Sequence, residues 1–185
     1  MIYKWKVCVL GDAAVGKTSL VRHYCEGYFR ENYLSTIGVS FLRKNLDINV
    51  DGQKHGVVLQ LWDLGGQTIF STVRANYLKG TSGALILFDL TEKITLSHVT
   101  NWYNDVKRTA GDIPILVIGN KMDLDYNKNV VNRAEKLCRD LGVELYLTSA
   151  KTGDHMNKVF EQISIKMINE NANTNKHIEV EKFGR

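Results

Sequence analysis

The 185-residue sequence has few of the features that mark several large classes of protein. Its three cysteines form no CxxC pair and no cysteine-histidine ligand spacing, which argues against a secreted disulfide framework and favours a reduced, intracellular chain. No apolar run approaches the roughly 18 residues that a membrane span requires, and the N-terminus lacks a signal-peptide core. The 24 Lys and Arg against 20 Asp and Glu leave a formal charge of +4, too small to indicate nucleic-acid binding.

The composition that remains, 44% hydrophobic and 24% charged, is that of one globular domain. Short, nearly continuous apolar runs alternate with helical patterns, an arrangement typical of strands buried on both faces of a parallel sheet. These runs begin at Val7, Ala84, Ile113 and Val143. The only proline, Pro114, falls at the start of its run, where a missing amide donor is tolerated. An α/β fold is therefore expected.

One segment departs from this alternation of strands and helices. Apolar and polar residues alternate up to Val50, and Asp51-Gly52 then leads into an extended run from His55 to Trp62. Asp-Gly between two extended runs indicates a hairpin. We therefore expect one antiparallel edge strand to join the parallel sheet.

The last helical pattern carries an apolar stripe at spacings of three and four, typical of a helix that packs on a sheet: Met156, Val159, Phe160, Ile163 and Met167. From about Glu170 the chain becomes polar and rich in asparagine and loses this periodicity. Residues 1–170 are thus expected to form one domain, and residues 171–185 a flexible tail.

The first apolar strand runs directly into a phosphate-binding pattern. Gly11-Asp12-Ala13-Ala14-Val15-Gly16-Lys17-Thr18 fits GxxxxGK[ST], and a helical stretch follows from Ser19. Glycines let the backbone wrap a phosphate closely, while amide N–H groups and the helix N-terminus supply positive potential. Lys17 is predicted to reach the β- and γ-phosphates, and the Thr18 hydroxyl to bind Mg²⁺. The alternative, a glycine-rich turn with a solvated lysine, does not require the strand and helix on either side.

A second motif suggests which base is bound. Asn120-Lys121-Met122-Asp123 follows the strand that ends at Gly119, at the carboxyl edge where open α/β sheets bind ligands. A carboxylate there accepts hydrogen bonds from the ring N–H and exocyclic amine of guanine, a pair that adenine does not offer. Leaving a buried carboxylate unmatched costs on the order of several kcal/mol. Asp123 is therefore the predicted specificity residue; the alternative is a polar turn.

A third motif, Asp63-Leu64-Gly65-Gly66-Gln67, follows the run that ends at Trp62. A carboxylate at a strand end beside a bound phosphate is an expected partner of Mg²⁺, and the glycines free the Gly66 amide to approach a γ-phosphate. Gln67 is then placed to orient a water molecule. The alternative is a Gly-Gly turn with an N-cap aspartate.

Together with Thr36-Ile37-Gly38 and Thr148-Ser149-Ala150-Lys151, these motifs resemble those of Ras-superfamily small GTPases, in order over about residues 3–170. The resemblance implies the P-loop G-domain fold: a mostly parallel six-stranded sheet with one antiparallel edge strand and helices on both faces. It implies bound GTP or GDP with Mg²⁺. It also assigns further site residues: Thr36 to Mg²⁺ and the γ-phosphate, Phe29 to the side of the guanine, Tyr33 to the phosphates, and Ser149, Ala150 and Lys151 to the base.

Within the superfamily the sequence is most similar to the Rab branch. The run from Ile37 to Phe41 resembles the Rab segment IGVDF, and the run from Leu59 to Asp63 resembles LQIWD. Gly65 stands where Ras and Rab proteins usually carry alanine, as in the Arf branch. The Rab resemblance implies an effector surface, for which partial core packing of the hairpin is the alternative explanation; its residues are Ile37, Phe41, Trp62 and Tyr77.

The resemblance further implies a slow GTP hydrolase in which Lys17 and Gln67 are the catalytic residues. Tyr33, and no arginine, occupies the place shortly before Thr36, so an activating protein is expected to supply an arginine. The implied partners are this activator, an exchange factor and effectors. The chain is expected to be a cytoplasmic monomer that reaches membranes through partners, and with no cysteine after Cys138 it is expected to carry no prenyl anchor.

Three other functions stay open at the level of sequence. A P-loop ATPase or nucleotide kinase shares the phosphate-binding loop, although the Asn120–Asp123 motif disfavours adenine. Ala13 replaces a glycine of the Ras pattern and, with Gly65, leaves open a pseudo-enzyme that binds GTP without hydrolysing it. An interaction module that ignores the nucleotide is the third.

Overall fold

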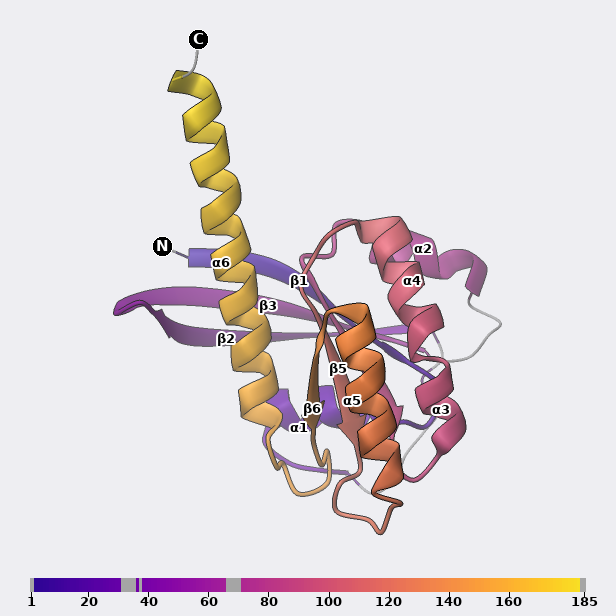
Figure 1. The fold of residues 1–185 in the computed structure, drawn as a ribbon. Coiled ribbons are helices and arrows are strands. Elements are labelled where there is room, and N and C mark those ends of the chain that lie inside the picture. Colours follow the sequence, from indigo (N-terminus) through magenta and orange to yellow (C-terminus); the bar gives the residue numbers. More distant parts are fainter. Residues whose placement is uncertain (1, 31–35, 37, 66–70, 184–185) are drawn as a thin grey trace.

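The computed structural model describes residues 2–30, 36, 38–65 and 71–183. One sheet carries helices on both of its faces (Figure 1). In chain order the elements are β1 (Ile2–Gly11), α1 (Lys17–Glu26), β2 (Val39–Val50), β3 (Gln53–Leu64), α2 (Ser71–Leu78), β4 (Gly83–Asp89), α3 (Lys93–Ser97), α4 (Val99–Ala110), β5 (Ile115–Asn120), α5 (Asn129–Leu141), β6 (Glu144–Leu147) and α6 (Met156–Phe183).

The six strands lie in the order β2-β3-β1-β4-β5-β6. All neighbours are parallel except β2 and β3, which pair antiparallel from Val39 opposite Leu64 to Val50 opposite Gln53. The two residues between these strands, Asp51 and Gly52, both have positive φ angles, 49° and 77°, as a type I′ hairpin turn requires. The predicted sheet, with its antiparallel edge strand, is confirmed.

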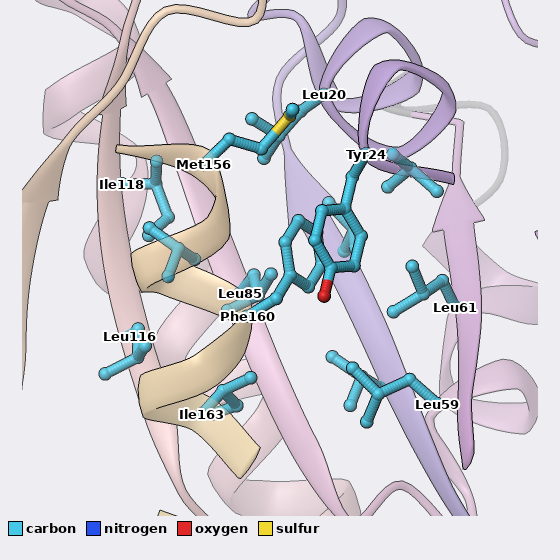
Figure 2. Close-up of a cluster of buried hydrophobic side chains, with 14 of the residues drawn as sticks. Leu20, Tyr24, Leu59, Leu61, Leu85, Leu116, Ile118, Met156, Phe160 and Ile163 are labelled. Atoms are coloured by element: carbon cyan, nitrogen blue, oxygen red, sulfur yellow. The ribbon is translucent and has the colours of Figure 1, made fainter. Parts of the chain in front are cut away.

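One face of the sheet is covered by α1 and α6. The ring of Tyr24 from α1 stacks on that of Phe160 from α6, with centroids 3.8 Å apart and planes inclined by 11° (Figure 2). The whole apolar stripe of α6, from Met156 to Met167, is buried in this cluster together with inward-facing residues of the strands. The predicted packing of that stripe on the sheet is confirmed.

The other face is covered by α4 and α5, with α2 and α3 beside α4 (Figure 1). Strand β1 shows why its apolar run has no polar interruptions: Val7 and Val9 belong to the first cluster, and Cys8 and Leu10 to the second. Alternate side chains of a strand point to opposite faces, so a strand covered on both sides needs apolar residues throughout.

Helix α6 is longer than the sequence pattern predicted. Periodicity ends near Glu170, but the helix continues to Phe183. No proline or glycine occurs between Met156 and Phe183, so no residue type there interrupts a helix. The flexibility of residues 171–185 stays a prediction. Among the described residues, none of the helices combines the length and the apolarity needed to cross a bilayer.

The topology determines where the motifs meet. Strand β1 has β3 on one side and β4 on the other, so the strand order changes direction at β1. In open α/β sheets ligands bind outside the carboxyl ends of the strands at such a point. The loops that follow β1, β3, β5 and β6 all leave from this edge and carry the motifs identified above.

Candidate functional site

The phosphate-binding loop lies between β1 and α1, which begins at Lys17. Gly16 has a φ angle of 98°, and a Cβ atom there would lie 2.2 Å from Nδ2 of Asn120. Only glycine suits this position, since it accepts the positive φ and leaves room for the asparagine. The amide of Asn120 donates a hydrogen bond of 2.9 Å to the Val15 carbonyl. The loop is thus hydrogen-bonded directly to Asn120, the last residue of β5.

The ammonium group of Lys17 is buried under this loop. Its Nζ donates to the carbonyl oxygens of Gly11, at 2.8 Å, and Asp12, at 2.5 Å. Burial lowers the pKa of Lys17 to about 8, although the nearby carboxylates of Asp63 and Asp12 act in the opposite direction. An ammonium has three N–H donors, so one remains for an anion beyond the two carbonyls of the described chain.

Three predicted metal ligands come together beside Lys17. The Thr18 hydroxyl donates to Oδ2 of Asp63 at 2.5 Å and lies 2.6 Å from the Thr36 hydroxyl. Asp63 is fully buried, and within the described residues its second oxygen, Oδ1, has no hydrogen-bond partner. Burial raises the pKa of Asp63, an effect that the Thr18 hydrogen bond and the Lys17 charge oppose.

The unpartnered carboxylate oxygen of Asp63 and the hydroxyl groups of Thr18 and Thr36 together form a set of hard oxygen donors. This is the ligand type that Mg²⁺ prefers. These residues therefore fit the ion that the sequence predicts. The described part of the chain has no cluster of three or more His, Cys, Asp and Glu side chains that would compete with this set.

Asn120 connects the phosphate loop to the last two motifs. Its side chain is buried, and its Oδ1 accepts hydrogen bonds from the Thr148 hydroxyl at 3.1 Å and the Ala150 amide at 3.0 Å. With its bond to Val15, one side chain thus joins the loops after β1, β5 and β6.

A cavity of about 310 Å³ lies where these loops meet. Two residues outside the sequence motifs, Arg30 and Leu124, also line this cavity. Leu124 directly follows Asp123, and its 47% exposure as an apolar residue is a signal that sequence alone does not give. The predicted residues that line the cavity are Ala14, Gly16, Ser19, Phe29, Asn120, Lys121, Asp123, Ala150 and Lys151.

The carboxylate of Asp123 is oriented by Ser149, whose hydroxyl donates to Asp123 Oδ1 at 2.6 Å. The Ser149 oxygen in turn accepts from the amides of Lys151 and Thr152, at 3.2 and 3.0 Å. Beside them the Lys121 ammonium lies 2.5 Å from Oδ2 of Asp89, a partner that the sequence motifs did not indicate. Hydrogen bonds through Ser149 therefore connect Asp123 to the backbone at Lys151 and Thr152.

The other predicted site residues are two in the phosphate-binding loop and four outside the described part of the chain. Ala13 is exposed and lies outside the cavity lining, whereas Val15 is buried. Four predicted residues lie outside the described part of the chain: Tyr33, Ile37, Gly66 and Gln67.

The predicted effector aromatics form a row that runs from the edge strand β2 across β3 to α2. Phe41 is 54% exposed, and its ring meets that of Trp62 edge to face at 5.6 Å. Trp62 in turn lies 6.4 Å from Tyr77, and both of these pack against the second core cluster. Core packing therefore explains in part why aromatic residues occur at Trp62 and Tyr77, but it does not explain the exposed ring of Phe41.

Comparison with known proteins agrees with this geometry. The family model described as Ras family matches residues 6–169. The chain is 34% identical over 176 residues to the Ras-related protein SEC4 of Saccharomyces cerevisiae, an alignment that covers 95% of this chain and 80% of that protein. It is 34% identical over 168 residues to Ras-related protein Rab-21 of Homo sapiens (90% and 73% covered) and 33% identical over 162 residues to Ras-related protein Rab-13 of Bos taurus (86% and 78%). The chain belongs to the Ras superfamily of small GTPases, in its Rab branch.

Proposed function

We propose that this chain is a magnesium-dependent switch that hydrolyses GTP slowly to GDP and phosphate and acts through protein partners in signalling or vesicle trafficking. The observation that carries the proposal is the hydrogen bonding of Asn120 to Val15 and Ala150. Because this side chain ties the phosphate loop to the base-side loops, one ligand with a polyphosphate and a guanine would span both.

On the phosphate side, the remaining N–H donor of Lys17 and the loop amides are proposed to contact the β- and γ-phosphates. Thr18, Thr36 and Asp63 would hold Mg²⁺, which when bound neutralises charge on these phosphates. The short contacts among the three side chains support this assignment, because they gather oxygen donors from α1, β3 and the segment before β2.

On the base side, Asp123 is proposed to accept hydrogen bonds from the ring N–H and exocyclic amine of guanine. The Ser149 hydroxyl already occupies one of its oxygens, which fixes the carboxylate before the base arrives. Phe29 and the backbone from Ser149 to Lys151 would enclose the ring. Phe29, Asp123, Ala150 and Lys151 line the 310 Å³ cavity, which supports the assignment.

Hydrolysis is proposed to proceed by in-line attack of a water molecule that Gln67 orients, with positioning and charge neutralisation as the sources of catalysis. Thr36 and Gly66 would hold their segments only while a γ-phosphate is present, and effectors would bind that state. A GTPase-activating protein would supply the missing arginine, and an exchange factor would restore GTP.

The experiment is single-turnover phosphate release from GTP by the purified chain with Mg²⁺, followed for hours, with Gln67→Leu as the matched variant. We expect slow release by the native chain and a rate lower by at least about tenfold in the variant, or about 1.4 kcal/mol in the barrier. Equal rates in the two proteins would contradict the role of Gln67 and favour the GTP-binding pseudo-enzyme. Loss of GTP within seconds would contradict the need for an activator.

A further inference from the structure

Trp102 of α4 contacts two parts of the molecule that no sequence motif connects. Its indole N–H donates a hydrogen bond of 2.8 Å to Oδ1 of Asp12, in the phosphate-binding loop. The guanidinium of Arg74, from α2, lies over the indole ring with its central carbon 3.9 Å from the ring centroid. One side chain therefore contacts both the loop after β1 and the helix that follows the Asp63–Gln67 motif.

Asp12 and Arg74 each make a second contact, with a residue of α4 or the residue just before it. Oδ2 of Asp12 lies 2.6 Å from Nδ1 of His98, the residue just before α4. Arg74 Nη1 donates to Oδ2 of Asp105 at 2.8 Å, one helical turn beyond Trp102. Trp102 is 5% exposed and the Arg74 side chain 14%, so the contact of Arg74 with the indole ring is shielded from water, whereas the His98 side chain beside Asp12 is 43% exposed. Shielded charged contacts contribute more than those on an open surface.

The position of Asp12 bears directly on the phosphate site. Its backbone carbonyl accepts one of the two hydrogen bonds that hold the Lys17 ammonium. A shift of Asp12 away from Trp102 would therefore move an acceptor of the lysine proposed to contact the phosphates.

We infer that Trp102 and Arg74 are positioning residues that couple helix α2 to the phosphate-binding loop. When Arg74 docks on Trp102, the indole is fixed, and its N–H fixes Asp12 and the carbonyl that holds Lys17. The coupling is reciprocal, so a nucleotide that orders the loop also favours the docked position of α2. The inference rests on the proposed function, since the ligand that it concerns is the guanine nucleotide.

The test is a double-mutant cycle on the dissociation rate of a fluorescent GDP analogue from the full chain in Mg²⁺. Arg74→Gln and Asp12→Asn are each expected to accelerate dissociation. The double variant should release the nucleotide at least about threefold more slowly than the product of the two single accelerations predicts, because the two residues belong to one network.

The same cycle in a Trp102→Phe background identifies the route of the coupling. Phenylalanine keeps a ring face for Arg74 but lacks the N–H that binds Asp12, so the two effects are expected to become additive there. Direct attraction between the Arg74 and Asp12 charges would leave the non-additivity unchanged, which would overturn the role of Trp102. If Trp102→Phe is too unstable to assay under the first conditions, the same cycle is measured at a lower temperature.

Arg108→Gln is the matched control. It removes the same charge from the same acceptor, since Arg108 donates to Oδ1 of Asp105 at 2.6 Å, but its side chain is 77% exposed and its hydrogen bond within the described residues goes to Asp105 and not to Asp12. Dissociation from this variant should stay within about twofold of the native rate.

Additive effects of Arg74→Gln and Asp12→Asn in the native background would overturn the inference while leaving the proposed function intact. Failure of the native chain to bind the GDP analogue would refute the proposed function and the inference together.

Discussion

Thr18 and Asp63 are separated by 45 residues in the sequence, and the Thr18 hydroxyl donates a hydrogen bond of 2.5 Å to Asp63 Oδ2. The other carboxylate oxygen is buried and, within the described residues, has no partner. A buried carboxylate oxygen in this situation is costly unless a cation or a water molecule contacts it. The pair thus joins the start of α1 to the end of β3 at a place suited to Mg²⁺.

Replacing Asp63 by asparagine should remove most of the effect of magnesium on nucleotide binding. In the native chain we expect Mg²⁺ to slow the dissociation of a fluorescent GDP analogue, and in Asp63→Asn we expect this slowing to shrink by at least about tenfold, or 1.4 kcal/mol. The measurement is the dissociation rate in Mg²⁺ and in EDTA. Asp47→Asn, at a carboxylate that is 65% exposed on β2, is the control. An undiminished magnesium effect in Asp63→Asn would contradict the assignment.

Replacing Asp123 by asparagine should change the preferred base. The amide has one acceptor oxygen and presents N–H donors to the exocyclic amine of guanine, so GDP affinity should fall by about 2 to 4 kcal/mol, roughly 30- to 1000-fold. A xanthine nucleotide, which has a carbonyl at the position of that amine, should bind the variant better than GDP.

Competition between a fluorescent GDP analogue and GDP, XDP or ADP checks this prediction. Asp125→Asn, at an exposed carboxylate two residues further along, should leave the order of affinities unchanged. A variant at Asp123 that keeps its preference for GDP would show that another group selects the base.

Gly65 makes a close backbone contact with the segment that carries Thr36. Its N–H donates to the Gly38 carbonyl at 2.9 Å, and a Cβ atom would lie 2.9 Å from the Thr36 carbonyl oxygen and 3.1 Å from that of Gly38. Gly65→Ala should displace the backbone at Thr36 and at Gly38 and move the Thr36 hydroxyl from its place beside Thr18. We expect affinity for a GTP analogue to fall relative to that for GDP, by about 1 kcal/mol or roughly fivefold. A ratio of the two affinities equal to that of the native chain would contradict this.

The core between α1 and α6 provides a test of stability away from the site. Phe160 is fully buried and stacks on Tyr24 (Figure 2), so Phe160→Ala should lower the free energy of unfolding by about 3 to 5 kcal/mol. Phe41→Ala removes the same side chain from a position that is 54% exposed and should cost less than about 1 kcal/mol. Urea unfolding of both variants gives the comparison, and similar losses would contradict the assignment of Phe160 to the core.

Much of this fold follows from local patterns. The run from Val7 to Leu10 is apolar throughout because both faces of β1 are covered, and Asp51-Gly52 forms the expected turn because both residues adopt positive φ angles. The gathering of the motifs at one edge follows from parallel strands, whose carboxyl ends meet there.

Other features depend on side chains from segments far apart in the chain. The bond from Trp102 to Asp12 crosses 90 residues, and that from Asn120 to Val15 crosses 105. Apolar periodicity predicts the buried face of a helix, as it does for α6, but not which atom of a distant loop an indole N–H reaches. Gly65 differs from the alanine usual in Ras and Rab proteins, but the sequence does not indicate its close contact with Thr36 and Gly38, which depends on the three-dimensional fold.

The most direct test of the switch is hydrogen exchange of the chain in two states, loaded with GDP and loaded with a non-hydrolysable GTP analogue. Thr36 and Gly66 are proposed to hold their segments only through a γ-phosphate. We therefore predict slower exchange with the analogue over residues 31–38 and 65–78, while the core strands β1, β4 and β5 exchange equally in both states. Equal protection of the two segments in both states would contradict a nucleotide-dependent switch.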